Sequence, residues 1–146
     1  MNTTVTWKQD IAFEGMGNST GFKVAIGGKP EAGQEPYGAS PLELLLLGTS
    51  GCTAMDVISI LTKKRQDVTA FEVRTHATRA TEHPMVFTHI MLEYVVTGYN
   101  LDPDAVKRAI DLSLEKYCCA HAMMSKVVPI DHRFTIHEAK REQQSG

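Results

Sequence analysis

Residues 40–66, "SPLELLLLGTSGCTAMDVISILTKKRQ", predict the longest helix of this chain and set its organisation. Ser40 can cap the helix, Pro41 stands at its first position, and Glu43 follows the cap by three residues, which together make a capping box. The cations of "TKKRQ" suit the negative end of the helix dipole. Apolar residues surround most of the middle, so we expect a helix over 41–66 that is buried on most sides.

The rest of the sequence predicts strands that cluster in hairpins, together with two shorter helices. Asp102 and Pro103 mark the start of the second helix as a cap and a first-turn proline. Strands grouped in this way favour an α+β fold over a doubly wound sheet. We expect one domain over 1–146, with a polar tail at about 139–146. The expected strands cover 3–13, 22–26, 68–80, 86–98 and 128–138, and the expected further helices cover 102–118 and 119–126.

Composition describes an ordinary globular chain. Its 146 residues are 42% hydrophobic and 22% charged, with a net charge of −2. This balance gives no reason to expect a nucleic-acid partner or an anionic membrane surface. We expect no segment to reach the roughly 18 apolar residues that a membrane crossing needs. The N-terminal residues lack a signal-peptide pattern, which favours a cytoplasmic location with reduced thiols.

The long helix also predicts a partner chain. A helix that is apolar almost all round must be covered from both sides, and one small antiparallel sheet covers only one side. A second copy of the chain can supply the other cover, so we expect a homodimer.

Three cysteines carry the chemistry that this sequence offers. Free cysteines in helices are usually small buried hydrophobes, but Cys52 directly follows the small residues 48–51, which leave room beside its sulfur. Glycine in a helix costs about 1 kcal/mol relative to alanine, so we expect a helix crossing or a substrate channel there. Cys118 and Cys119 lie at a predicted helix junction, and a thiol at a helix N-terminus has a lowered pKa.

Two uses of these thiols compete. In a redox cycle one thiolate becomes a sulfenic acid and a second thiol condenses with it to a disulfide. A zinc site could instead recruit Cys52, Cys118, Cys119 and His121. Adjacent cysteines rarely both reach one metal and no C-x-x-C motif is present, so redox chemistry is favoured and no metal is expected.

Two segments, "SPLELLLLGTSGCTAMDVISILTKKRQDV" (40–68) and "VKRAIDLSLEKYCCAHAMM" (106–124), resemble the OsmC/Ohr family, the osmotically induced and organic hydroperoxide resistance proteins, and especially their YhfA-like branch. The resemblance implies antiparallel sheets wrapped around two central helices in an intertwined homodimer, with the reactive sites at the interface. It also implies thiol-dependent reduction of organic hydroperoxides in oxidative or osmotic stress, without metal, flavin or other cofactor, reset by an external dithiol of lipoyl type.

The resemblance also assigns roles to residues. Cys52 matches the peroxidatic cysteine and Cys118 the resolving one, while Cys119 is either a substitute for Cys118 or a packing residue. The peroxidases of the family hold the thiolate with an N-terminal arginine, whereas residues 1–64 contain none, which leaves Lys23 or Lys29 as substitutes. Lysine lacks the planar fork of arginine.

The glutamate of those peroxidases also has no direct counterpart. It stands ten residues before the cysteine, where this chain has Leu42. Glu43, nine before Cys52, is a possible accessory residue. At about 100° per residue the two lie on opposite faces of a straight helix, so capping is the favoured role of Glu43.

The sequence therefore leaves three alternative functions, of which the first is favoured. The first is a thiol peroxidase that acts on organic hydroperoxides through a Cys52–Cys118 disulfide. The second is a non-catalytic binder or redox sensor of small hydrophobic electrophiles on the same dimeric fold. The third is a structural dimer with inert thiols.

Overall fold

The computed structural model describes residues 1–142, and the terminal part of the predicted tail, 143–146, lies outside the described residues. Chain contacts divide the protein into two compact units, Met1–Leu47 and Gly48–Gly146. The mixed α+β architecture predicted from the sequence is confirmed, with strands in two small sheets.

The first unit contains a three-stranded antiparallel sheet in the order β1-β2-β3. Its strands are β1 (Thr3–Gln9), β2 (Ala12–Gly17) and β3 (Lys23–Ile26). The single strand expected over 3–13 is wrong, because the chain turns at Asp10 and Ile11. Asp10 has a φ of 43°, a left-handed conformation that aspartate adopts more readily than most residues.

The second unit contains a sheet in the order β4-β5-β6, formed by β4 (Asp67–Arg79), β5 (Phe87–Tyr99) and β6 (Ile130–Glu138). Strands β4 and β5 pair antiparallel, whereas β5 and β6 pair parallel. The sheet thus departs from the purely antiparallel arrangement expected. The segment between β5 and β6 forms the helices of this unit. A helical crossover of this kind lets β6 run in the same direction as β5.

Those helices are α2 (Pro103–Leu112), the π-helix η1 (Ser113–Tyr117) and α3 (Cys119–Met124). The carboxylate of Asp102 accepts a hydrogen bond of 3.0 Å from the backbone of Asp104, so the predicted cap is confirmed. The helix expected to continue to residue 118 changes instead to π geometry after Leu112. Such wide turns often occur at functional positions.

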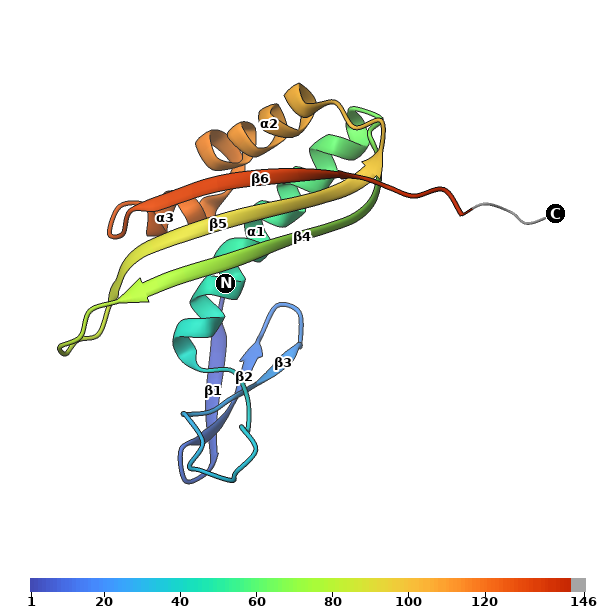
Figure 1. The fold of residues 1–146 in the computed structure, drawn as a ribbon. Coiled ribbons are helices and arrows are strands. Elements are labelled where there is room, and N and C mark those ends of the chain that lie inside the picture. The colour runs from blue at the N-terminus through green and yellow to red at the C-terminus, as the bar shows by residue number, and fades with distance from the viewer. Residues whose placement is uncertain (143–146) are drawn as a thin grey trace. The chain divides into compact units, whose positions relative to one another are not determined.

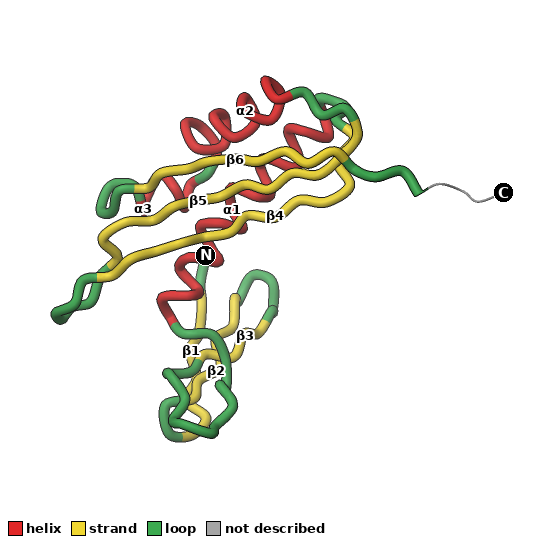
Figure 2. Tube along the Cα trace, in the orientation of Figure 1, coloured by secondary structure: helices red, strands yellow, loops and turns green. Residues whose placement is uncertain are grey.

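The core of the second unit lies on one face of the sheet. Strand β5 alternates strictly, with one set of side chains buried against the helices that lie across that face (Figures 1 and 2). Helix α1 (Pro41–Lys63) contributes its inward positions and α2 contributes its own apolar stripe. The fully buried core residues include Val57, Leu61, Ile90, Leu92, Tyr94, Val96, Val106 and Ala109.

Helix α1 begins as the sequence predicts. The backbone N–H of Ser40 donates to the Glu43 carboxylate at 2.8 Å, and the backbone N–H of Glu43 donates to the Ser40 hydroxyl at 3.3 Å. This is the reciprocal pair of a capping box, so two backbone donors of the first turn are satisfied.

Helix α1 is also long and apolar enough, by length and composition, to cross a membrane, with a mean hydropathy of 1.7 over its most apolar window. The expectation that no segment reaches this threshold is therefore wrong. Core helices of folded domains pass the same test, so the observation is weak evidence for a membrane span.

Candidate functional site

Three thiols and a carboxylate meet in the second unit. The sulfur of Cys52 lies 3.9 Å from the sulfur of Cys119. The sulfurs of Cys52 and Cys118 and a carboxylate oxygen of Asp56 all lie within 4.8 Å of one another. The structure therefore brings together all three cysteines that the sequence singled out, together with an acidic residue that it did not.

Local structure explains this convergence. Cys52 and Asp56 are four positions apart on α1, which places them on the same helix face. Cys118 is the N-cap of α3, where its sulfur accepts a hydrogen bond of 3.3 Å from the backbone of His121. Its own backbone N–H donates to the carbonyl of Ser113 at 2.7 Å and closes the π-turn. Two segments distant in sequence thus present their sulfurs to each other.

The environment of Cys52 favours its thiolate. Partial burial acts to raise the pKa of the Cys52 thiol, but hydrogen bonds from the backbone N–H of Ala120 and the thiols of Cys118 and Cys119 outweigh it. The charge of Asp56 opposes them, and the net pKa lies below the ordinary value. Hydrogen bonds to the charged form of a thiol favour ionisation. These donors come from the start of α3 and its cap, and not from an arginine.

Cys118 behaves in the opposite way. Burial raises the pKa of its thiol to about 12, with a smaller contribution from the neighbouring Cys52 thiolate. The side chain is only 2% exposed, whereas that of Cys119 is exposed. The expectation that the helix junction lowers the pKa of Cys118 is therefore wrong, because loss of solvent outweighs the hydrogen bond from His121.

A chain of buried hydroxyls runs from the sheet to this cluster. Tyr94 on β5 and Thr53 on α1 share a hydrogen bond of 2.8 Å, and Thr53 and Ser113 share another of 2.8 Å. The hydroxyl of Ser113 then donates to the Asp56 carboxylate at 3.0 Å. All three hydroxyl-bearing residues are fully buried. Burial also raises the pKa of Tyr94 to about 12, so it stays protonated at neutral pH.

Sequence reasoning missed Asp56, Thr53 and Ser113. Asp56 could have been found from its position one helical turn after Cys52, since residues four apart share a face. Thr53, Ser113 and Tyr94 carry no comparable signal, because small polar residues on three separate elements show their relationship only after folding.

The cluster of Cys52, Asp56 and Cys118 offers three atoms of types that bind thiophilic cations. Two of these atoms are thiols that must lose their protons to bind, and burial holds the Cys118 thiol in its protonated form. His121 was the fourth member of the zinc alternative. Burial lowers the pKa of its ring, and its Nδ1 atom has no hydrogen-bond partner among the described residues.

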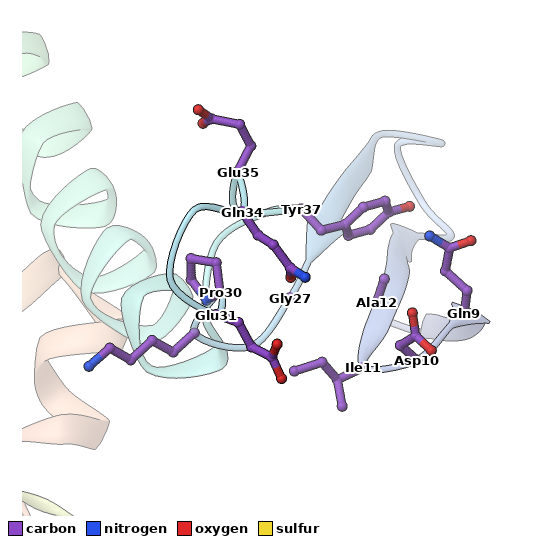
Figure 3. Close-up of a pocket in the computed structure, with 12 residues that line it drawn as sticks. Gln9, Asp10, Ile11, Ala12, Gly27, Pro30, Glu31, Gln34, Glu35 and Tyr37 are labelled. Atoms are coloured by element: carbon purple, nitrogen blue, oxygen red, sulfur yellow. The ribbon is translucent and has the colours of Figure 1, made fainter.

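The remaining sequence candidates lie in the first unit. Glu43 is engaged with Ser40 in the capping box, and these hydrogen bonds lower the pKa of its carboxyl. Lys23 pairs with Glu14 at 3.2 Å. Lys29 lines a pocket of about 400 Å³ between the β1–β2 turn and the loop that carries Pro30 and Tyr37 (Figure 3). The described residues that line this pocket include no cysteine, so it offers no thiol chemistry.

The two glycines before Cys52, Gly48 and Gly51, have open space around them. A Cβ added at Gly48 or Gly51 would meet no atom within 4 Å in the described part of the chain, apart from the helix's own backbone and its neighbours. Packing within one chain therefore does not require these two glycines, and the room beside Cys52 is open.

Comparisons with known proteins agree on one family. A family model described as "OsmC-like protein" matches residues 32–133. Protein YhfA of Escherichia coli (strain K12) is 40% identical over 136 residues, which cover 93% of this chain and 98% of that protein.

Solved structures share the fold. A crystal structure of a hypothetical protein from Aquifex aeolicus VF5 is 27% identical, with a TM-score of 0.82, and the match covers 95% of this chain and 97% of that one. The organic hydroperoxide resistance protein OhrB of Bacillus subtilis is 16% identical, with a TM-score of 0.62, covering 92% and 98%. At that identity the second likeness concerns the fold alone.

Proposed function

Because this chain belongs to the OsmC-like protein family, we propose that it is a thiol-dependent peroxidase that reduces organic hydroperoxides. The resemblance to this family and its YhfA-like branch, drawn from the sequence, is confirmed. The activity itself is the proposal, and the observation that carries it is that the sulfurs of Cys52 and Cys118 lie within 4.8 Å of each other, with the Cys119 sulfur 3.9 Å from that of Cys52.

The reaction begins at Cys52. Its thiolate attacks the outer oxygen of the hydroperoxide, the O–O bond breaks, and the alkoxide takes a proton and leaves as an alcohol. Cys52 becomes a sulfenic acid. The sulfur of Cys118 then attacks the sulfenic sulfur, which forms the disulfide and releases water. An external dithiol, of lipoyl type by the family resemblance, reduces this disulfide and is itself oxidised.

The lowered pKa of Cys52 supports this assignment of roles, because the thiolate is the nucleophile. Hydrogen-bond donors at the start of α3 stabilise the Cys52 thiolate, which is the role that the family resemblance gives to an N-terminal arginine. Two large apolar side chains near the thiols in sequence, Met55 and Tyr117, are 73% and 53% exposed. Such surfaces favour a hydrophobic hydroperoxide over hydrogen peroxide.

We also propose that the protein acts as a homodimer in the reducing cytoplasm. Several large apolar side chains of the second unit lie exposed on the single chain, and burial against a partner would remove their apolar surface from water. A second copy covers them without a different protein. The exposed residues are Met55, Ile58, Val86, Tyr117, Met123 and Val127.

A stoichiometric assay tests the activity. The protein is mixed with cumene hydroperoxide and dithiothreitol, and peroxide consumption is followed for wild type and for Cys52→Ser. We expect turnover by wild type and none above background by the variant. No consumption by wild type, or equal consumption by Cys52→Ser, would contradict the proposal.

One observation favours a second function. Without an arginine in residues 1–64, the transition state for peroxide attack lacks the bidentate donor that the family resemblance implies. The protein would then act as a redox sensor, modified at Cys52 without cycling. Intact-mass spectrometry after a peroxide pulse separates the two, since a lasting sulfenic acid or mixed disulfide favours the sensor and a rapid internal disulfide favours the enzyme.

A further inference from the structure

Asp56 is an acidic residue beside the thiols of Cys52 and Cys118, and the reaction described above gives it no role. Its carboxylate lies within 4.8 Å of the sulfurs of both Cys52 and Cys118. Its charge acts against ionisation of both thiols. A group that only opposes the reactive thiolate is a cost to a thiol enzyme, so its presence at this position calls for a compensating function.

The hydroxyl chain identifies what Asp56 can do. A serine, threonine or tyrosine hydroxyl has one hydrogen to donate. Because Ser113 donates its hydrogen to Asp56, the hydrogen between Thr53 and Ser113 must come from Thr53. Thr53 then has none left for Tyr94, so Tyr94 donates to Thr53. Every hydrogen bond in the chain therefore points toward the Asp56 carboxylate, which is the terminal acceptor.

We propose that Asp56 is the general base of the resolving step, and accepts the proton of the Cys118 thiol as that sulfur attacks the sulfur of Cys52. This inference rests on the proposed function. The proton passes to Asp56, the new S–S bond forms, and the S–O bond of the sulfenic acid breaks. The departing hydroxide takes the proton back from Asp56 and leaves as water, so the carboxylate is regenerated.

The geometry suits this transfer. A separation within 4.8 Å is short enough for a small rotation of the side chain, or for one intervening water molecule, to complete the path. Cys118 also needs such a base, because burial raises the pKa of its thiol to about 12 and so leaves very little thiolate at neutral pH. The Ser113 hydroxyl occupies one acceptor position of the Asp56 carboxylate, which leaves the remaining acceptor positions for the thiols.

A peroxide-free assay isolates the resolving step. In a Cys119→Ser background only Cys118 can resolve, and the conservative change at an exposed position spares the fold. Attack of Cys52 on 5,5′-dithiobis(2-nitrobenzoate) releases one coloured thiolate and leaves a mixed disulfide. Attack of Cys118 on that mixed disulfide releases a second. The two phases are followed by stopped-flow absorbance.

Adding Asp56→Asn to this background should slow the second phase about 100-fold, since general bases contribute at least this factor. The first phase should be unchanged or faster, because the charge that opposes the Cys52 thiolate has gone. Slowing of the second phase without slowing of the first is not expected from a merely structural role. Asp56→Glu, which restores a carboxylate, should recover part of the lost rate.

The outcomes are decisive in both directions. A second phase at the parent rate in Asp56→Asn, or equal slowing of both phases, overturns the assignment. If Asp56→Asn does not fold, as judged by circular dichroism, Ser113→Ala removes the donor and keeps the carboxylate. We then expect a slower second phase alone, and an unchanged second phase overturns the proposal. Failure of wild type to consume cumene hydroperoxide would instead refute the proposed function. The two-phase assay contains no peroxide, so its result is independent of that outcome.

Discussion

Thr53 on helix α1 and Tyr94 on strand β5 are both fully buried and share a hydrogen bond of 2.8 Å. Thr53 also bonds to Ser113, so its single hydroxyl satisfies two buried partners. Thr53→Val leaves both partners short, whereas Tyr94→Phe removes only one bond. A buried polar group left without its partner costs about 1–3 kcal/mol. We expect Thr53→Val to lower the free energy of unfolding by about 2–3 kcal/mol and Tyr94→Phe by about 1 kcal/mol, measured by urea denaturation. If neither variant lowers the free energy of unfolding, these hydrogen bonds do not stabilise the fold.

The resolving thiol can be identified with two single variants. The sulfur of Cys119 is 3.9 Å from that of Cys52 and the side chain is exposed, so it can replace Cys118. After one equivalent of peroxide, Cys118→Ser should still form a Cys52–Cys119 disulfide and Cys119→Ser a Cys52–Cys118 disulfide. Peptide mapping by mass spectrometry locates each bond, and the double variant should stop at the sulfenic acid. A Cys118→Ser variant that also stops there would restrict resolution to Cys118.

The reactivity of the thiols should differ sharply with pH. The pKa of Cys52 is lowered from its ordinary value, so its thiolate fraction at neutral pH exceeds that of the same thiol without these hydrogen bonds. Alkylation of Cys52 by iodoacetamide should therefore rise with a midpoint below that of glutathione measured in parallel. Cys118, with a pKa of about 12, should stay unmodified throughout this range while the protein is folded. A Cys52 midpoint at or above that of glutathione would contradict the hydrogen bonding from α3.

Glu43 is predicted to act through the capping box. Ser40→Ala and Glu43→Ala each break one of the two reciprocal hydrogen bonds, and we expect each to cost about 1 kcal/mol. Neither change should alter the rate of Cys52 alkylation at pH 7. A large loss of Cys52 reactivity in Glu43→Ala alone would give this residue the accessory role that the sequence left open, with Ser40→Ala as the matched control.

Gly51 tests the proposed dimer. An added side chain meets no atom within 4 Å in the described part of the chain, so one chain alone tolerates it. Alanine there should even favour the helix by about 1 kcal/mol. If a second copy crosses at this point, Gly51→Leu should weaken self-association at least tenfold by analytical ultracentrifugation and slow the reaction of Cys52. Gly51→Ala serves as the control with a smaller side chain. If Gly51→Leu changes neither self-association nor the rate of Cys52 reaction, a second copy does not pack closely against Gly51.

Local signals in the sequence predicted much of this fold. Ser40, Pro41 and Glu43 mark the start of α1, and Asp102 with Pro103 marks the start of α2, because capping chemistry depends on neighbouring residues. The parallel pairing of β5 with β6 was missed, because pairing direction depends on where an intervening segment docks.

In the candidate site too, residue identities could be predicted from the sequence, whereas properties that depend on packing could not. The three cysteines were identified as residue types with reactive chemistry, and their convergence was expected from a family resemblance. The raised pKa of Cys118 was not foreseen, since burial is a property of the packed protein and not of a helix junction. Asp56 was overlooked because an acidic residue in a helix is ordinarily a solvated one.

The π-turn of η1 lets this segment accept a change in length of one residue without a change in the direction of the residues that follow. Because the backbone of Cys118 bonds to Ser113 and not to the next residue along, the turn accommodates one residue more than a regular helix would. Removing one residue between them would let a regular helical turn, with four steps of about 100° each, span the same segment with almost the same total rotation. The serine that holds Asp56 and the sulfur that this carboxylate serves would then keep their relative directions, so relatives that preserve the chemistry should tolerate the loss of this one extra residue.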